Sequence, residues 1–177
     1  LNEEDNTFII RDTGIGMTRD ELKSNIGTIA KSGTVEFLKK SAEASEDTVN
    51  LIGKFGVGFY SVFMAAEKVE VTSRSAEPDS DVYTWTSTGE GSFRIGSGPD
   101  DFKRGTEIKA FLRDEAKEFA SSDTVKNVIE KYSNFVPFPI YLNDEQVNTV
   151  SAIWREPKSS VKDKDYKEFY KFIAHFN

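Results

Sequence analysis

The stretch Thr7-Phe8-Ile9-Ile10-Arg11-Asp12-Thr13-Gly14-Ile15-Gly16 carries the first decisive signal for the fold. Its β-branched and aromatic first half predicts a strand over residues 7–11, which the turn-forming residues then end. An ionised carboxylate at a strand end accepts hydrogen bonds, and a flat heterocycle with an exocyclic amine is a natural donor. Two glycines one residue apart let the backbone approach such a ring closely. By itself the pattern fits an ordinary Asp-x-Gly turn equally well.

A second signal, Gly53-Lys54-Phe55-Gly56-Val57-Gly58, runs directly into an apolar stretch that predicts a helix over residues 59–67. Backbone N–H groups and the positive end of a helix dipole meet at such a junction, and anions bind there. A tight loop that needs positive φ angles would explain the glycines without a ligand. No Gly-Lys-Ser/Thr triplet follows, and Arg19 stands where a dinucleotide-binding pattern from Gly14 needs its last glycine. Two common nucleotide folds are therefore disfavoured.

A third signal is Gly105-Thr106 at the start of a predicted strand over residues 106–112. Because side chains alternate along a strand, the Thr106 hydroxyl joins an apolar stripe that includes Ile108. This hydroxyl can bond the edge of a base directly or through a water, or it can be satisfied by backbone at the strand end.

Alternation elsewhere predicts three more strands, over residues 69–72, 83–86 and 92–95, in antiparallel succession with the strand over 106–112. Thr18 and Glu21 form a capping box that opens a helix ending near Asn25. A helix after Ser122 is expected to pack back on the sheet, and residues 140–142 to form a closing strand before a turn at 143–144. A last helix carries one apolar stripe, made of Tyr166, Phe169, Tyr170 and Ile173.

Composition excludes several classes of protein. The 177 residues, 37% hydrophobic and 30% charged, contain no run of 18 apolar residues that could span a membrane. A net charge of −7 argues against a broad nucleic-acid surface. The absence of cysteine and the single histidine, His175, exclude disulfides and thiolate or multi-histidine metal sites. The chain begins at Leu1 without a signal-peptide pattern, so a targeting segment could have been removed.

The three signals, in this order, resemble the GHKL ATPases, the group that includes DNA gyrase and the histidine kinases. Residues 12–17, 25–33 and 53–61 are similar to the heat-shock protein 90 family almost residue for residue, and residues 131–135 and 166–172 extend the resemblance over nearly the whole chain. It implies an α+β fold, a two-layer sandwich with a mostly antiparallel sheet and helices on one face, whose N-terminal segment is missing here. Residues 1–147 would be the ATP-binding domain, and residues 148–177 a linker and the start of the middle domain.

The resemblance assigns an ATP- and ADP-binding role to individual residues. Asp12 would bind the adenine amine, with Thr106 assisting. Gly16 and Met17 would line the base pocket, and Gly14 is also implied to bind ATP. A mobile lid over roughly residues 27–50 would bring polar side chains beside the ribose and phosphates. The residues implied there and in the phosphate cradle are Asn25, Lys31, Ser32, Gly53, Gly56, Val57, Gly58 and Phe59.

The family's general base is a Glu and its Mg²⁺ ligand an Asn, both on a helix before the Asp-x-Gly-x-Gly strand. Only eleven residues precede Asp12, too few for such a helix and its return. We therefore expect no catalytic residue and no metal ligand in this chain, although the resemblance implies that the intact protein would hydrolyse ATP. The upstream helix is expected to supply the Mg²⁺ site.

The resemblance also implies an ATP-dependent chaperone in which lid closure and hydrolysis act on client proteins in a homodimer, without nucleic acid or membrane partners. The short stretch before Trp154 is similar to bacterial and mitochondrial members of the family. The details of residues 132–135 favour the mitochondrial paralogue named for tumour necrosis factor receptor association, and hence the mitochondrial matrix, with the cytoplasm as the alternative. Two other readings remain open. One is a different GHKL ATPase, either a histidine kinase or a DNA-handling enzyme, and the other is a non-enzymatic scaffold that retains the pocket.

Overall fold

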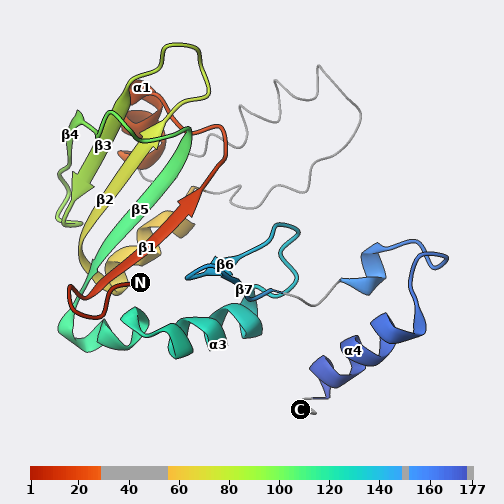
Figure 1. The fold of residues 1–177 in the computed structure, drawn as a ribbon. Helices are drawn as coiled ribbons and strands as arrows, with labels where there is room; N and C mark the ends of the chain where they lie inside the picture. The colour runs from red at the N-terminus through yellow and green to blue at the C-terminus, as the bar shows by residue number, and fades with distance from the viewer. Residues whose placement is uncertain (29–55, 149–151, 175–177) are drawn as a thin grey trace. The chain divides into compact units, whose positions relative to one another are not determined.

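The computed structural model describes residues 1–28, 56–148 and 152–174, and these residues form two compact units (Figure 1). One unit comprises residues 2–117, and the other comprises residues 118–177 together with Leu1. No helix in the described ranges is long and apolar enough to cross a membrane. The first unit contains most of the residues to which the sequence assigns a function.

A five-stranded antiparallel sheet forms the centre of the first unit, with the order β1-β5-β2-β3-β4. Its strands are β1 (Thr7–Asp12), β2 (Ala66–Arg74), β3 (Val82–Ser87), β4 (Arg94–Ser97) and β5 (Gly105–Leu112). All five predicted strands are present, and the α+β fold with a mostly antiparallel sheet is confirmed. The predicted succession is wrong at its last step, because β5 pairs with β1 and β2 rather than with β4. β5 has apolar residues to bury between two neighbours, whereas the short, mostly exposed β4 suits an edge.

The two faces of this sheet differ in polarity. Ile10, Ile108, Val71 and Trp85 lie in register across β1, β5, β2 and β3, so their side chains share one face. Val71 is fully buried, and Trp85 is 2% exposed. One step along the strands, the opposite face carries Arg11, Glu107, Thr72 and Thr84 in register. The sheet therefore has one polar face and one apolar face, which is buried at Val71 and Trp85 but open at the β1 edge, where Ile10 is 53% exposed.

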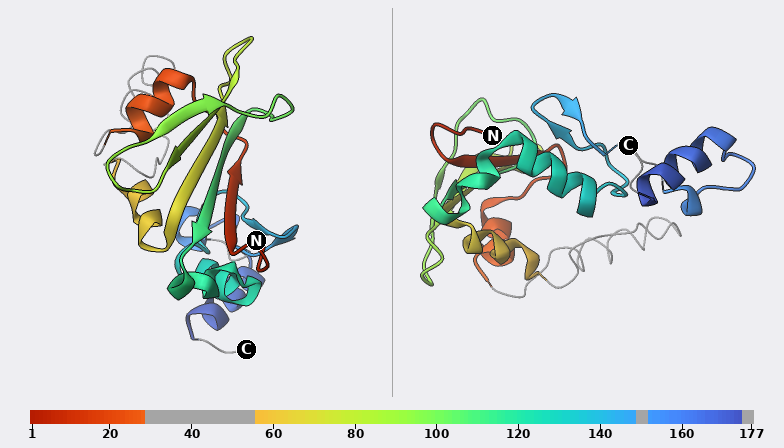
Figure 2. Two further views of the ribbon diagram at one scale, coloured as in Figure 1. Left: turned by 90° about the vertical axis from the view of Figure 1, so that its left-hand side faces the viewer. Right: turned by 90° about the horizontal axis from the view of Figure 1, so that it is seen from below.

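Short helices cover the apolar face. They are α1 (Arg19–Glu21), the π-helical turn η1 (Leu22–Ile26) and the 3₁₀ helix η2 (Gly58–Met64), all on one side of the sheet (Figure 2). The capping box is confirmed, since Glu21 N donates to Thr18 Oγ1 at 3.3 Å and Thr18 N to Glu21 Oε2 at 2.8 Å. The predicted helix over 59–67 is shorter than expected. It ends before Ala66, where burial of Ala66, Val69 and Val71 in the sheet takes over.

The second unit contains α3 (Ser122–Tyr132), the strands β6 (Tyr141–Leu142) and β7 (Glu145–Gln146), the 3₁₀ turn η4 (Ile153–Arg155) and α4 (Asp163–Ile173). A further 3₁₀ helix, η3 (Asp114–Ala120), spans the boundary between the units. The turn at 143–144 is confirmed, with both residues at positive φ as a tight hairpin requires. The predicted strand over residues 140–142 does not close the large sheet, because β6 pairs with β7 in a separate two-stranded sheet. The predicted boundary at 147/148 falls inside this unit and stays a prediction, as does packing of α3 on the larger sheet.

An aromatic cluster organises the end of the second unit. Phe135 contacts the rings of Trp154, Phe169 and Phe172, at centroid distances of 4.7, 6.2 and 5.3 Å. The predicted apolar stripe on α4 is therefore only partly correct. Phe169 packs in the cluster, whereas Tyr166, Tyr170 and Ile173 are at least half exposed. Phe172, which lies outside the predicted stripe, contacts the Phe135 ring instead.

Candidate nucleotide-binding site

A row of polar side chains ends the apolar face of the large sheet. Asp12 on β1 pairs with Thr106 on β5, and Thr106 pairs with Ser73 on β2. These residues lie two positions beyond the apolar row of Ile10, Ile108 and Val71, so their side chains point from the same face. A flat ligand would thus meet apolar side chains along the strands and hydrogen-bonding groups at the strand ends.

The loop over residues 13–17 is fastened to the end of β2. Ile15 O accepts from Ala76 N at 2.7 Å, and Met17 N donates to Ser73 Oγ at 2.8 Å. Between them, Gly16 has a φ of +63°, and a Cβ on it would lie 1.9 Å from Arg74 O. Only glycine fits there. Both Gly16 and Met17, predicted to line the base pocket, therefore lie beside the polar row.

The contacts of Asp12 are compatible with both roles that the sequence left open. Its Oδ1 accepts from Gly14 N at 2.8 Å, which is ordinary turn chemistry. Gly14 allows this close approach, because a Cβ on it would lie 2.9 Å from Oδ1. Within the described ranges Oδ2 has no hydrogen-bond partner, and Asp12 is exposed. An ionised carboxylate has about four acceptor positions, so the turn leaves Asp12 able to accept from a ligand amine.

Ser73, which the sequence reasoning missed, joins the loop to β5. It is fully buried, and its Oγ lies 3.0 Å from both Gly105 O and Thr106 Oγ1. The signal for it was the same as for Thr106, namely a hydroxyl at an inward position of an apolar strand, after Val69 and Val71. Gly105 also has a positive φ of +126°, and a Cβ there would lie 2.1 Å from Asp12 O. Close approach of β5 to Asp12 therefore requires this glycine.

The glycine-rich segment enters the described structure at Gly56, which has a φ of +64° and precedes η2. Nothing lies within 4 Å of a Cβ built on Gly58, so the backbone at the start of η2 is accessible. The Phe59 ring meets Trp85 edge to face at a centroid distance of 5.7 Å. Trp85 belongs to the row of Ile10 and Ile108, so η2 lies over the sheet face from which Asp12 projects.

The predicted ribose and phosphate residues are only partly described. Asn25 lies on η1, where its Oδ1 accepts from Ser24 Oγ at 3.2 Å. The Tyr60 hydroxyl donates to Ile26 O at 2.7 Å and so links η1 to η2, and burial raises the pKa of Tyr60. Val57 caps η2 without a side-chain hydrogen bond. Lys31, Ser32 and Gly53 lie outside the described residues.

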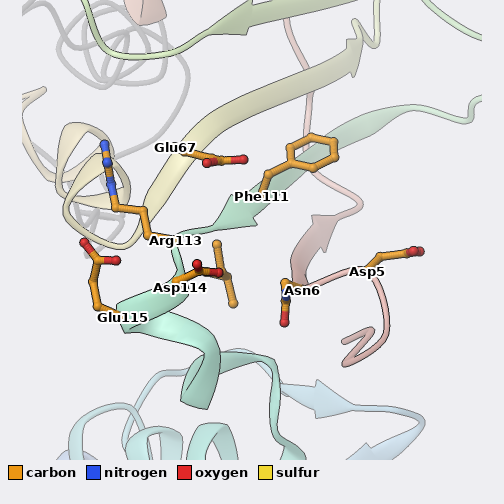
Figure 3. Close-up of a pocket in the computed structure, with 8 residues that line it drawn as sticks. Asp5, Asn6, Glu67, Phe111, Arg113, Asp114 and Glu115 are labelled. Carbon is orange, nitrogen blue, oxygen red and sulfur yellow. The ribbon is translucent and has the colours of Figure 1, made fainter.

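A hollow of about 330 Å³ lies at the other end of β1 and β5 (Figure 3). Its lining includes Asp5, Glu67, Arg113, Asp114 and Glu115. Five register steps separate the Thr7–Phe111 pair beside it from the Asp12–Thr106 pair, a distance of about 17 Å at 3.4 Å per residue. The hollow is therefore separate from the polar row.

Clusters of potential metal ligands were sought among the described residues. In residues 1–28, 56–148 and 152–174, no three His, Cys, Asp or Glu side chains gather where they could hold a metal ion. The donor set at the polar row, one carboxylate beside two hydroxyls, fits an amine-bearing heterocycle better than a divalent cation.

A family model described as "Histidine kinase-, DNA gyrase B-, and HSP90-like ATPase" matches residues 1–91, just over half of the chain. The chain belongs to this ATPase family. The match covers β1, the loop over 13–17 and the glycine-rich segment, although not Thr106 on β5. The sequence resemblance to the GHKL ATPases is thereby confirmed.

Three relatives, each named "Chaperone protein HtpG", narrow the branch of this ATPase family. The protein of Desulfitobacterium hafniense (strain Y51) is 51% identical over 175 residues, which is 98% of this chain and 28% of the relative. Those of Oleidesulfovibrio alaskensis and Chlorobium chlorochromatii are 50% and 49% identical over 98% of this chain, and 27% and 28% of their own length. The chain thus spans about 28% of the first of these relatives. They support an ATPase domain of the heat-shock protein 90 type.

The expected mitochondrial location is wrong. The relatives are bacterial HtpG proteins, identical to this chain at about half of the aligned positions along nearly its whole length. They do not specifically support the mitochondrial paralogue. The details at residues 132–135 that favoured the paralogue are only a few residues, and agreement over about 175 residues outweighs them.

Proposed function

We propose that this chain carries the adenine-binding part of the nucleotide site in an ATP-dependent molecular chaperone. The observation that supports this most directly is the polar row at the end of an apolar sheet face, beside a loop that close glycine contacts hold in place. The apolar rows favour a planar ring, and Asp12 offers an unused acceptor to an exocyclic amine. The family match and the names of the relatives agree with this function.

In this proposal each predicted residue keeps its role. Asp12 Oδ2 accepts from the adenine amine while Oδ1 stays in its turn, and Thr106 assists beside it. Gly14, Gly16 and Met17 form the wall of the base pocket. Asn25, Lys31 and Ser32 approach the ribose and phosphates, and amides from Gly53 to Phe59 cradle the phosphates. The residues of that cradle are Gly53, Gly56, Val57, Gly58 and Phe59.

For the whole protein we propose ATP hydrolysis coupled to the folding of client proteins, in a homodimer and with Mg²⁺ bound beside the phosphates. The residues of this chain bind and orient the nucleotide, and the general base and the Mg²⁺ ligand come from elsewhere in the protein. A ligand shifts a conformational equilibrium only through different affinities for its states, so lid closure requires that ATP bind the closed form more tightly. We propose the cytoplasm as the location, in keeping with the bacterial relatives.

Substitution of Asp12 tests the site. Asp12→Ala should weaken ADP binding by about 1.5 to 3 kcal/mol, tenfold to a hundredfold or more, because a hydrogen bond to a charged group is lost. Calorimetric titration of the whole protein with ADP measures this. Asp5→Ala, which removes another exposed carboxylate from the same unit, is the matched control and should leave ADP binding unchanged. A loss under threefold at Asp12 would contradict its role, and failure of the unmodified protein to bind any adenine nucleotide would favour a scaffold.

A client assay tests the chaperone function. The whole protein with ATP should slow the aggregation of a thermally unfolding test protein, followed by light scattering. Asp12→Ala should remove the part of this protection that depends on ATP. Equal protection with and without ATP in the unmodified protein would mean that the nucleotide does not drive the activity.

A further inference from the structure

The buried hydroxyl of Ser73 makes three contacts whose hydrogen positions can be assigned by counting protons. Met17 N–H can only donate to it, at 2.8 Å, and Gly105 C=O can only accept from it, at 3.0 Å. The third contact, with Thr106 Oγ1 at 3.0 Å, permits either direction. A serine hydroxyl has one proton and two lone pairs, so three bonds use all of its capacity.

The single proton of Ser73 goes to Gly105 O. The alternative, a bond from Ser73 to Thr106, would leave the Gly105 carbonyl without this partner at a buried position. Because Ser73 has no exposed surface and Gly105 is buried, a water molecule could not replace Ser73 as the hydrogen-bond partner of this carbonyl. Its two lone pairs then accept from Met17 N–H and from the Thr106 hydroxyl. Thr106 has therefore used its only proton inside the protein.

We propose that Ser73 is a positioning residue that selects the base by fixing the polarity of Thr106. With its proton given to Ser73, Thr106 presents only lone pairs to a ligand, and its neighbour Asp12 is an acceptor as well. Two adjacent acceptors favour a purine with an amine at carbon 6, and oppose one with a carbonyl there, because that carbonyl would face two acceptors without a proton between them. Ser73 thus favours adenine over hypoxanthine and guanine without touching the base. The inference rests on the proposed nucleotide site.

The ratio of the dissociation constants for inosine diphosphate and ADP tests this polarity, because inosine diphosphate has a carbonyl in place of the adenine amine. Calorimetric titration of the whole protein measures both. In Ser73→Ala, the Thr106 proton is released and can turn toward the carbonyl. The preference for ADP should therefore fall by about tenfold, roughly the effect of one hydrogen bond. Ser73→Thr, which keeps the hydroxyl, should retain the preference.

A second variant separates polarity from general damage to the structure. In a Thr106→Val background there is no hydroxyl to redirect, so adding Ser73→Ala should leave the ratio within about twofold of that of Thr106→Val alone. Weakening of ADP and inosine diphosphate by the same factor in Ser73→Ala would overturn the proposal. So would an equal change of the ratio in both backgrounds.

If Ser73→Ala does not fold, as judged by circular dichroism, Thr106 provides the test. Thr106→Ser should keep the preference, and Thr106→Val should reduce it by removing an acceptor. An unchanged ratio in Thr106→Val would overturn the proposal. Asp12→Ala distinguishes failure of the proposed nucleotide site from failure of the proposed role of Ser73. If Asp12→Ala weakens ADP binding while the Ser73 and Thr106 variants leave the ratio of the two dissociation constants unchanged, the nucleotide site is supported and only the role of Ser73 is contradicted.

Discussion

The two ends of the β1–β5 pair differ in how their polar groups are held. At the Asp12 end, the hydroxyls of Ser73 and Thr106 bond each other, and the first also bonds the backbone of Met17 and Gly105. At the other end, the hollow is lined by exposed charges (Figure 3). One of them, Asp114, has an 89% exposed side chain and pairs with Lys117 at 2.9 Å.

This difference concerns how well each end is prepared to bind a ligand. Exposed carboxylates are already solvated by water, so a ligand at the hollow gains little by replacing that water. At the Asp12 end, the hydroxyls of the buried Ser73 and the part-buried Thr106 are oriented by the fold before any ligand arrives, and an unused oxygen of Asp12 stands beside them. Orientation in advance lowers the cost of binding. Three substitutions test this contrast, beginning with the one of largest expected effect.

Gly16→Ala should disrupt the Asp12 end. The new Cβ would lie 1.9 Å from Arg74 O in a backbone with φ of +63°, so the loop must move and Met17 N–H must leave Ser73. We expect the free energy of unfolding to fall by about 3 kcal/mol, measured by urea denaturation. Gly96→Ala on β4 is the control, because nothing lies within 4 Å of its Cβ, and it should cost less than about 1 kcal/mol. Equal costs at the two glycines would mean that the loop is not held as described.

Tyr60→Phe should have a smaller effect, on the link between η1 and η2. Loss of the hydrogen bond from Tyr60 Oη to Ile26 O should lower the free energy of unfolding by about 1 kcal/mol. Burial raises the pKa of Tyr60 in the folded state above its ordinary value of 10.0. Its contribution is therefore fully present below pH 10.0 and is lost as the pH rises through the raised pKa. Unfolding measured in urea at increasing alkaline pH should show this loss in the unmodified protein and not in Tyr60→Phe.

Tyr83→Phe is the matched control for that measurement. The Tyr83 hydroxyl makes only a long contact, 3.4 Å to Asp81 Oδ2, at an exposed position. Its removal should change stability by less than about 0.5 kcal/mol. An alkaline loss of stability that persists in Tyr60→Phe would assign the effect to another group.

Local patterns predicted the strands and the candidate site better than they predicted neighbours. Alternation located four of the five strands, because burial of one face repeats every second residue, and β-branched and aromatic composition located β1. Asp12 and Thr106 were noted as polar residues at strand ends. The insertion of β5 between β1 and β2 was not predicted, since alternation shows that a strand has a buried face and not which strand lies beside it. Ser73 was missed for a similar reason. Its importance comes from three partners on other segments, and a serine within a strand gives no sign of them.

Helix ends were also difficult to predict. The run over residues 59–67 forms the 3₁₀ helix η2 up to Met64 and begins the strand β2 at Ala66. Apolar residues are common in both kinds of element, so the pattern could not place the boundary. On α4, aromatic residues occur on more than one side, so spacing alone could not decide that Phe172 rather than Tyr170 packs in the cluster around Phe135.

Glu115→Gln should have the smallest effect and tests the hollow directly. Glu115 is exposed and lines the hollow. The strand pair beside the hollow, Thr7–Phe111, lies about 17 Å from the Asp12–Thr106 pair, which is beyond the screening length of about 10 Å at 0.1 M salt. We expect ADP affinity to change by less than twofold and the free energy of unfolding by less than about 0.5 kcal/mol. Asp12→Asn is the matched control, because it removes the same charge at the other end and should weaken ADP binding at least tenfold. If Glu115→Gln weakened ADP binding more than Asp12→Asn, the nucleotide would bind at the hollow, and the polar row would serve the fold alone.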